Sequence, residues 1–346
     1  MVKEPEFKRS EIKNRKNQVA KPRKHKYFTG LIFVIVVLLG TFFLYLGHIY
    51  RDAQEMTTKI YSSSNITKAR DTQSLLKAGK PISILLMGTD TGAVGRNFKG
   101  RTDTMIVLTL NPQKNKMTIV SLPRDALVAV TGYKKYYPSK LNSAYDYGGS
   151  GTTIKTVQNY LNIPIDFYAT INMGGLENMV NAVGGITVKP LLTFSYGGHS
   201  FVKNKTTKMN GSTALAYVRM RHSDPLGDYG RQQRQRQVLT KVAQNGTKLK
   251  SLMTERFFKE IKKQLKTDIT FNDMLLLALK YRGTTRNMTS DHLQGEADLI
   301  SGISFESVPA TEKQRITNLI RSSLNLESAT TGNTLLNSSS INTTEK

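Results

Sequence analysis

Residues 27–50 contain no Asp, Glu, Lys or Arg, and residues 31–46 (LIFVIVVLLGTFFLYL) are apolar almost throughout. A helix needs about 20 apolar residues to cross the hydrocarbon core of a bilayer, and the aromatic residues near both ends suit the membrane interfaces. A buried core helix rarely runs this long beside ten basic residues. A cleaved signal peptide usually has a shorter apolar region followed by a small-x-small site, which is not evident here. The sequence therefore predicts one N-terminal transmembrane helix at 27–50.

The charges that flank this helix predict its orientation. Residues 1–26 contain ten Lys or Arg and three Asp or Glu, and such an excess of basic residues marks the cytoplasmic side. We therefore expect a cytoplasmic basic tail at 1–26 and a single-pass type II protein of the cell membrane, with its large domain outside. The absence of cysteine fits an exported protein built without disulfides.

The formal net charge of the chain is +25, and a basic balance this large favours an anionic partner. Composition alone leaves nucleic acid, acidic membrane lipid, a phosphorylated ligand and an anionic polymer open. A domain outside the membrane does not meet chromosomal DNA, so we expect no nucleic-acid partner.

Beyond the predicted helix, the chain divides into a polar stalk at 51–80, a folded domain at 81–327 and a Ser/Thr/Asn-rich tail at 328–346 that is predicted to be disordered. Apolar runs predict strands at 82–87, 104–110, 117–121, 167–171, 186–188 and 303–308. Helical patterns appear at 152–161, 175–183, 210–219, 229–244, 257–265 and 272–281. The turn-rich connector NPQKNK predicts a hairpin between the second and third strands. Strands alternating with helices predict an α/β domain with helices on both faces of a sheet.

Arginine and aspartate recur at the ends of these predicted elements. The segments MGTD (87–90), GRTDT (100–104) and SLPRD (121–125) each border a strand, and open α/β sheets bind ligands beyond the carboxyl ends of their strands. The densest cluster contains Arg219, Arg221, His222, Asp224, Asp228, Arg231, Arg234, Gln235 and Arg236. Arg231 and Gln235 lie four apart on one helix face, close to N-terminal amides that favour anions. The planar fork of arginine donors suits phosphate.

Each cluster alone has a simpler explanation. Asp90 fits a turn, Arg101 and Asp103 fit an ion pair at a strand edge, and the 219–236 cluster fits a solvated basic face. Together, several arginines with two or three aspartates indicate a phosphate cradle that holds a divalent cation, because Mg²⁺ takes hard oxygen ligands and binds phosphate oxygens. Such a site transfers phosphoryl groups mainly by positioning and charge neutralisation.

The segments LLMGTD, GRTDTM, SLPRD, KLNSAY, NAVGGITV, LAYVRMRHSD and DYGRQQRQRQ occur in this order within residues 81–308. This ordered set resembles the LytR-CpsA-Psr family. The resemblance implies an α/β/α sandwich with a central mixed sheet, preceded by one N-terminal transmembrane helix, and a long apolar groove for a lipid tail. It also implies a phosphotransferase of Gram-positive bacteria, which moves an anionic glycopolymer (teichoic acid or capsular polysaccharide type) from a polyprenyl-pyrophosphate carrier to peptidoglycan outside the membrane.

The resemblance also implies roles for residues of this chain. The implied pyrophosphate-binding residues are Arg101, Arg124, Arg219, Arg221, Arg231 and Gln235. The implied ligands of Mg²⁺, or alternatively of Mn²⁺, are Asp90, Asp103 and Asp228. The expected catalytic residues are Asp103, Arg101 and Arg124. Asp103 is the preferred acceptor of the hydroxyl proton, although metal ligation competes for the same carboxylate.

Two other classes of function remain open. One is a non-catalytic or regulatory binder of anionic lipid or wall polymer, of the membrane-bound transcriptional attenuator type. The other is a transcriptional regulator, which the membrane anchor disfavours and for which no helix-turn-helix is evident. Carboxylates among the arginines separate the binder from the transferase, because metal-assisted transfer needs them. Residues 274–279 (MLLLAL) fit a lipid groove, but a helix core is the commoner explanation.

Overall fold

The computed structural model describes residues 51, 54–55, 57–89, 100–221, 223–246 and 264–335. The chain separates into two compact units, 1–51 and 52–346, and the second contains nearly all of the described residues. Across the described ranges, no helix combines the length and apolarity that crossing a bilayer requires. The predicted cytoplasmic tail and transmembrane helix, at 1–26 and 27–50, lie outside those ranges.

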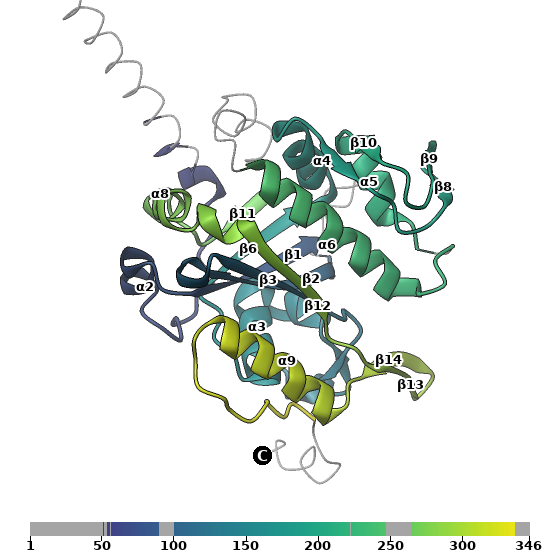
Figure 1. Ribbon diagram of the computed structural model, residues 1–346. Coiled ribbons are helices and arrows are strands. Elements are labelled where there is room, and N and C mark those ends of the chain that lie inside the picture. The colour runs from purple at the N-terminus through teal and green to yellow at the C-terminus, as the bar shows by residue number, and fades with distance from the viewer. Residues whose placement is uncertain are drawn as a thin grey trace, which may run out of the picture. The chain divides into compact units, whose positions relative to one another are not determined.

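A six-stranded mixed sheet forms the centre of the unit 52–346 (Figure 1). In sheet order its strands are β11 (Leu265–Thr267), β6 (Phe167–Asn172), β1 (Ile82–Thr89), β2 (Thr102–Asn111), β3 (Lys116–Leu122) and β12 (Asn287–His292). β2 is antiparallel to β1 and β3, and β11 is antiparallel to β6. β6 runs parallel to β1, and β12 runs parallel to β3. The predicted central mixed sheet is therefore confirmed.

The central strands contribute apolar side chains to both faces of the sheet. In β1, Ile82 and Ile84 belong to one buried cluster, whereas Leu85 and Met87 belong to another. Successive side chains of a strand point to opposite faces, so the continuous run ISILLM supplies two cores at once. Such runs are typical of strands that are covered on both faces.

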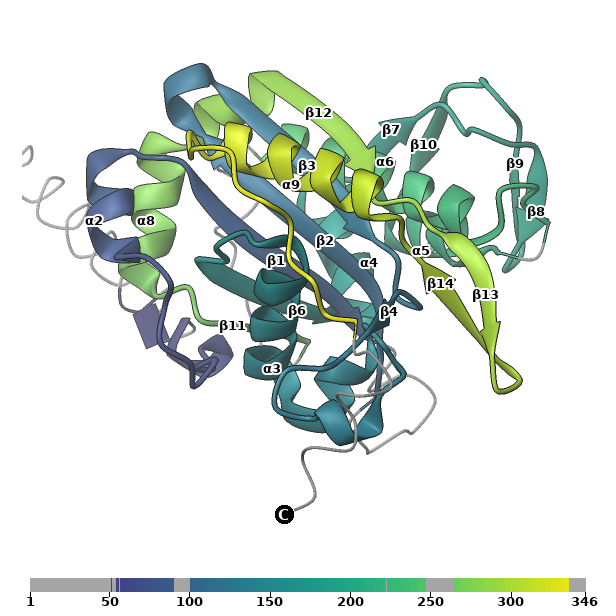
Figure 2. The same cartoon turned by 90° about the horizontal axis from the view of Figure 1, so that it is seen from below.

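Helices cover both faces of this sheet, as Figures 1 and 2 show. α3 (Ser143–Leu161) and α9 (Ala310–Ser323) pack on one face, where Val157 and Ile316 are fully buried. α2 (Thr72–Ala78), α6 (Gly227–Gly246) and α8 (Phe271–Lys280) pack on the other face, where Leu76 is fully buried. The predicted layering of helix, sheet and helix is confirmed.

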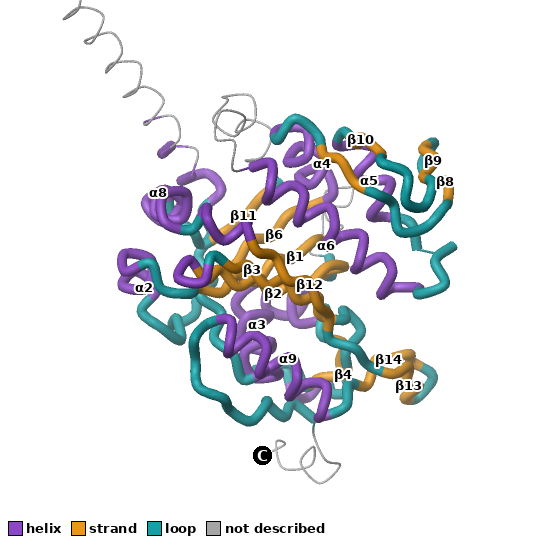
Figure 3. The backbone as a smooth tube through the Cα atoms, in the orientation of Figure 1, coloured by secondary structure: helices purple, strands orange, loops and turns teal. Residues whose placement is uncertain are grey.

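The remaining elements form a smaller lobe and two hairpin-like pairs (Figure 3). The lobe contains α4 (Met173–Ala182), α5 (Gly211–Arg219), the pair β7 (Ile186–Val188) and β10 (Thr207–Met209), and the pair β8 (Phe194–Tyr196) and β9 (His199–Phe201). The other two pairs are β4 (Leu127–Val128) with β5 (Ser139–Lys140), and β13 (Glu296–Ile300) with β14 (Ile303–Ser307).

Local sequence sets several of these boundaries. The side chain of Asn210 accepts a hydrogen bond from the Thr213 amide at 3.0 Å and caps α5. Thr270 and Asp273 form a reciprocal capping box at the start of α8. The predicted hairpin is formed by β2 and β3, which pair in register from Met105 with Leu122 onwards.

Some elements differ from the sequence-based expectations. Leu265, expected to end a helix at 257–265, begins β11 instead, and residues 257–263 lie outside the described ranges. β12, β13 and α9 were not predicted. β12 (NMTSDH) is an edge strand with no fully buried side chain, so it lacks the apolar alternation that reveals a strand.

The folded unit extends beyond the predicted boundaries at 81 and 327. Within the predicted stalk, Arg70 pairs with Asp166. Within the predicted tail, the carbonyl of Thr334 accepts the Ala129 N–H at 2.8 Å. Ion pairs and backbone hydrogen bonds attach much of these segments to the domain. Such contacts leave no apolar pattern in the sequence, so the polar composition predicted a stalk and a disordered tail instead. Residues 336–346 lie outside the described ranges.

Candidate functional site

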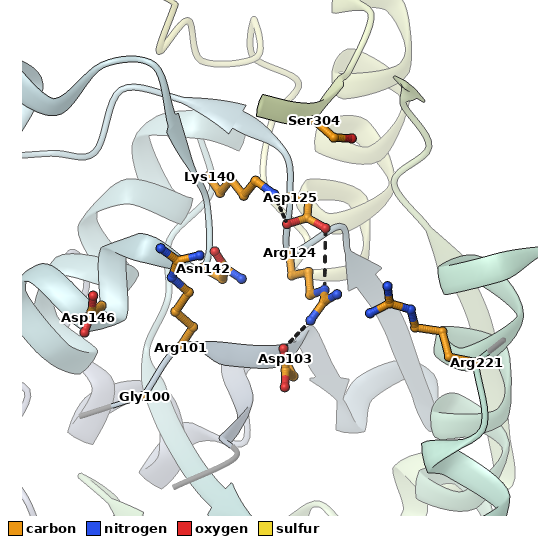
Figure 4. Close-up of a pocket in the computed structure, with 10 residues that line it drawn as sticks. All are labelled: Gly100, Arg101, Asp103, Arg124, Asp125, Lys140, Asn142, Asp146, Arg221 and Ser304. Carbon is orange, nitrogen blue, oxygen red and sulfur yellow. Dashed lines mark hydrogen bonds and ion pairs between the residues drawn. The ribbon is translucent and has the colours of Figure 1, made fainter. Parts of the chain in front are cut away.

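A polar pocket of about 630 Å³ opens at the end of the sheet where β3 ends and β2 begins. Four basic side chains line it, together with three acidic ones and three other residues (Figure 4): Arg101, Arg124, Lys140, Arg221, Asp103, Asp125, Asp146, Gly100, Asn142 and Ser304. Antiparallel pairing of β2 with β3 explains the convergence, because Met105 lies opposite Leu122 and brings the GRTDT and SLPRD segments together.

The pocket brings together four of the predicted site residues. Arg101, Asp103 and Arg124 come from the strand ends, and Arg221 reaches in from the segment after α5 (Figure 4). Asp90, predicted as a metal ligand, lies outside the described residues, as does His222.

Arg124 stands at the centre of the pocket. Its guanidinium pairs with Asp103, and its Nε lies 3.5 Å from Oδ2 of Asp125, whose Oδ1 is 3.0 Å from Nζ of Lys140 (Figure 4). Burial lowers the pKa of Arg124, but the charges of Asp103, Asp125 and Asp228 outweigh it, so the pKa is raised overall. Arg124 is therefore a permanently charged donor whose orientation two carboxylates fix.

The first turns of α6 form a second layer of polar side chains behind Asp103. Nη2 of Arg231 donates to the carbonyl of Asp103 at 3.1 Å and lies 2.6 Å from Oδ1 of Asp228. Gln232 donates to the other Asp228 oxygen at 3.1 Å. Burial lowers the pKa of Arg231, and Asp228 opposes this effect. Neither Arg231 nor Asp228 lines the pocket, and the Asp228 carboxylate contacts Arg231 and Gln232 of the same helix. The predicted role of Asp228 as a metal ligand stays a prediction.

Two further predicted site residues lie away from the lining. Arg219 is exposed in the last turn of α5. The Oε1 atom of Gln235 is buried and has no hydrogen-bond partner among the described residues. Their predicted contact with pyrophosphate stays a prediction.

Arg234 and Arg236, which belong to the same basic segment, serve the fold. Arg234 pairs with Asp224 and donates from Nε to the carbonyl of Tyr217 at 2.9 Å. Arg236 donates from Nε to Ser290 Oγ at 2.9 Å, and burial lowers its pKa to about 10. The basic cluster at 219–236 is therefore not one solvated face. Some of its arginines lie at or near the pocket, and others are buried in the fold.

Six lining residues were not among the predicted site residues: Gly100, Asp125, Lys140, Asn142, Asp146 and Ser304. Asp125 belongs to SLPRD, and Lys140 and Asn142 belong to KLNSAY, so the motifs contained a signal for these three. Ser304 comes from β14, which no charged motif marks.

The donor set of the pocket is compatible with Mg²⁺. Within the described ranges, no group of three or more His, Cys, Asp or Glu could hold a metal. Mg²⁺, however, usually takes one or two protein carboxylates and fills its other positions with substrate phosphate and water. Asp103 faces the pocket among four cationic side chains that suit a pyrophosphate. The residues therefore fit a metal that binds together with its phosphate ligand.

Tyr229 and Glu306 pack behind Asp125. The Tyr229 hydroxyl donates to the Glu306 carboxylate, and the Gly295 N–H lies 2.8 Å from the former and 3.0 Å from the latter. The backbone N–H of Glu306 donates to the carbonyl of Asp125 at 2.9 Å. Burial raises the pKa of Glu306, the hydrogen bond from Tyr229 opposes this, and the charges of Asp228 and Asp125 add to it.

Replacing Glu306 with glutamine is expected to change stability in a pH-dependent way. The pKa of Glu306 is raised in the folded state. The contribution of this group to the stability of wild-type protein therefore falls as the pH rises from its unfolded pKa through its folded pKa. Glutamine stays neutral and keeps an acceptor for Gly295. The Tm difference, Glu306→Gln minus wild type, should therefore become more positive between about pH 4 and about pH 7.

Thermal unfolding at both pH values measures this effect. Glu296→Gln on the exposed side of β13 is the control for the same change of charge. A Tm difference for Glu306→Gln that is constant with pH, or that changes no more than in the control, would contradict the expectation.

Comparison with known proteins gives consistent matches. Residues 43–322 match the LytR_cpsA_psr family. The chain is 40% identical over 304 residues to an Enterococcus faecalis protein named polyisoprenyl-teichoic acid–peptidoglycan teichoic acid transferase TagU, covering 87% of this chain and 99% of that one. Among solved structures, an Enterococcus faecalis protein described as a transcriptional regulator has a TM-score of 0.66 at 37% identity, covering 73% and 91% of the two chains. Bacillus subtilis TagU has a TM-score of 0.57 at 33% identity, covering 72% and 98%.

Proposed function

Because the chain belongs to the LytR-CpsA-Psr family, we propose that it is a phosphotransferase that moves an anionic glycopolymer from a polyprenyl-pyrophosphate carrier to peptidoglycan. The observation that carries this proposal is the pocket that Arg101, Arg124, Lys140 and Arg221 line together with the carboxylate of Asp103. The name of the Enterococcus faecalis relative supports a teichoic acid as the class of glycopolymer.

The proposed reaction is one displacement at phosphorus. A hydroxyl of a peptidoglycan sugar attacks the phosphorus that is bonded to the glycan. The bond from this phosphorus to the oxygen shared with the second phosphorus breaks, and polyprenyl phosphate leaves with the electron pair. The glycan keeps one phosphate and becomes joined to peptidoglycan through a phosphodiester. The hydroxyl proton passes to a base, for which Asp103 is the preferred residue.

The side chains of the pocket act mainly through charge and position. Arg124 is held by Asp103 and Asp125, so its donors need little reorganisation when charge develops on the phosphate oxygens. Arg101 and Arg221 approach from opposite sides (Figure 4) and would clamp the pyrophosphate between them. Bound Mg²⁺ or Mn²⁺ would supply further neutralisation of the pyrophosphate charge, with Asp103, Asp90 and Asp228 as its proposed ligands.

The proposed location is the outer face of the cell membrane of a Gram-positive bacterium, with 27–50 as the anchor and the folded domain outside. Protease added to intact cells is expected to digest the domain and leave the 1–26 tail intact, because basic residues mark the cytoplasmic side. Immunoblotting with antibodies against each part measures this. A domain that is digested only after cell lysis would contradict the topology.

The alternative is a non-catalytic or regulatory binder of the same lipid-linked glycan. Binding and turnover measured on one purified preparation separate the two functions. With Mg²⁺, lipid-linked glycan and peptidoglycan, wild-type protein should release polyprenyl phosphate. The Asp103→Asn variant should still bind the donor, but it should release polyprenyl phosphate at least about 100-fold more slowly than wild type.

The control for this experiment is Asp71→Asn. Asp71 caps α2 far along the chain from the pocket motifs, and asparagine caps helices equally well. Its turnover should match that of wild type. Stoichiometric donor binding by wild type without any release would favour the binder and overturn the proposed transferase.

A further inference from the structure

A cluster of three tyrosines lies beside the pocket and has no role in the proposed reaction. Tyr133 and Tyr136 border a short 3₁₀ helix (Lys134–Tyr136), and Tyr147 comes from α3. The ring centroids of Tyr136 and Tyr147 are 5.0 Å apart, those of Tyr133 and Tyr147 are 5.5 Å apart, and those of Tyr133 and Tyr136 are 6.4 Å apart. These distances are typical of packed aromatic rings.

The cluster is anchored on its inner side and open on its outer side. Tyr133 and Tyr147 are partly buried and pack against the core beneath the sheet. Tyr136, in contrast, is 48% exposed. A β-carbon on Gly148 would lie 3.2 Å from the Tyr133 ring and 2.0 Å from Thr152 Oγ1, so only glycine leaves room for this arrangement. The two inner rings therefore pack against Tyr136 and leave part of its ring exposed.

The same chain segment supplies both the tyrosines and one side of the pocket. Lys140, Asn142 and Asp146 line the pocket beside Arg101 (Figure 4). Tyr147 directly follows Asp146, and consecutive Cα atoms are about 3.8 Å apart. Ser139, which precedes Lys140, donates its hydroxyl to the Tyr136 carbonyl at 2.5 Å. The tyrosine cluster is thus linked to the lining of the pocket by neighbouring positions of the same chain segment.

Two lysines directly precede Tyr136 in the chain. Nζ of Lys135 lies 5.1 Å from the ring centroid of Tyr136, and Lys134 is exposed next to it. An aromatic ring offers an apolar face to the C–H side of a sugar ring, while its hydroxyl remains available for hydrogen bonding. The ammonium groups add attraction for phosphate. Rings and lysines together match a chain of sugars and phosphates better than they match a neutral sugar chain.

We propose that Tyr136, supported by Tyr133 and Tyr147, binds the sugar units of the donor glycopolymer that follow the pyrophosphate, with Lys134 and Lys135 beside their phosphates. This assignment rests on the proposed function, because it places the donor pyrophosphate in the neighbouring pocket. The surface sets which glycan is accepted and where it leaves the pocket. The acceptor peptidoglycan is assigned no contact with it.

The test compares two lipids that differ only in their glycan. One is a short-chain polyprenyl pyrophosphate without sugar, and the other carries a disaccharide followed by one glycerol-phosphate-type unit. Tyr136→Ala should weaken binding of the glycosylated lipid by about three- to tenfold and leave binding of the bare lipid unchanged, because one aromatic contact is lost. Tyr136→Phe keeps the ring and should bind both lipids nearly as wild type does.

A second pair of variants tests the charge. Lys134→Ala with Lys135→Ala should weaken binding of the glycosylated lipid at low salt, and added salt should reduce the difference. An unchanged affinity in this double variant would overturn the assignment of an anionic glycan. If Tyr136→Ala weakened binding of both lipids equally, or weakened binding of neither, the sugar site would be overturned.

Binding and transfer are read separately, so the two proposals can fail independently. If Tyr136→Ala raised KM for peptidoglycan and left donor affinity unchanged, the tyrosines would hold the acceptor and this proposal would be wrong. Absence of transfer by wild-type protein would overturn the proposed function, whereas the difference between the two lipids in binding would still decide the site.

Discussion

Replacing Arg124 with alanine is expected to lower the transfer rate at saturating donor by at least about 100-fold. Arg124 is the central cation of the pocket, and its loss also releases Asp103 and Asp125 from the pairs that orient them. Lysine at this position keeps the charge but lacks the planar fork, so Arg124→Lys should recover only part of the rate. Release of polyprenyl phosphate under single-turnover conditions measures the effect.

Arg286→Ala is the matched control, because Arg286 is exposed in a 3₁₀ helix that contributes nothing to the pocket. Its rate should stay within about twofold of wild type. Thermal unfolding of both variants shows whether the loss is catalytic or structural. A folded Arg124→Ala protein with a rate close to that of wild type would remove Arg124 from the site.

Replacing Arg234 with methionine is expected to destabilise the domain by about 3–5 kcal/mol. The Arg234 side chain is 1% exposed and pairs with Asp224, which is also buried. It donates to backbone carbonyls at the end of α5 and lies over the rings of Phe194 and Tyr217. Removal of the guanidinium leaves the Asp224 carboxylate buried without its partner. Urea unfolding, monitored by circular dichroism, measures the loss.

The double variant Arg234→Met, Asp224→Asn serves as the control for this loss. It removes both charges, so part of the lost stability should return. If Arg234→Met alone lost less than about 1 kcal/mol, the pair would contribute no more than an exposed ion pair does. Arg234 would then contribute little to the stability of the fold.

The sequence was informative where chemistry coincides with a strand end. Asp103 and Arg124 each follow or precede an apolar run, and antiparallel pairing of two adjacent strands is enough to bring them together. The expected pocket therefore required only the correct sheet order. Asp228 shows the limit of this reasoning, because its contacts with Arg231 and Gln232 depend on how α6 packs.

The division within the basic cluster could not be predicted from spacing. Arg231 and Arg234 are three residues apart on one helix, yet one reaches the carbonyl of Asp103 and the other enters the core of the lobe. Both are long, charged and buried, so only tertiary packing separates their roles. Ser304 illustrates the same limit, since it reaches the pocket from a hairpin whose sequence has no charged motif.

The tyrosine cluster likewise could not be predicted from the sequence without knowledge of the fold. Tyr133 and Tyr136 have the local spacing of one turn, but Tyr147 meets them only because α3 begins directly after the segment that lines the pocket.

Elements with few apolar residues were also missed from the sequence. α9 buries few apolar side chains, among them Ile316 and Ile320, and its remaining positions carry little signal of a helix.

The fate of the two donor phosphates tests the proposed transferase most directly. Purified protein is incubated with Mg²⁺, peptidoglycan and a polyprenyl-pyrophosphate-linked glycan, and both products are analysed by mass spectrometry. One displacement at the glycan-bound phosphorus predicts polyprenyl monophosphate as one product and glycan joined to peptidoglycan through one phosphate as the other. Glycan attached without phosphate together with polyprenyl pyrophosphate, or a donor that remains bound and intact, would contradict the proposed reaction.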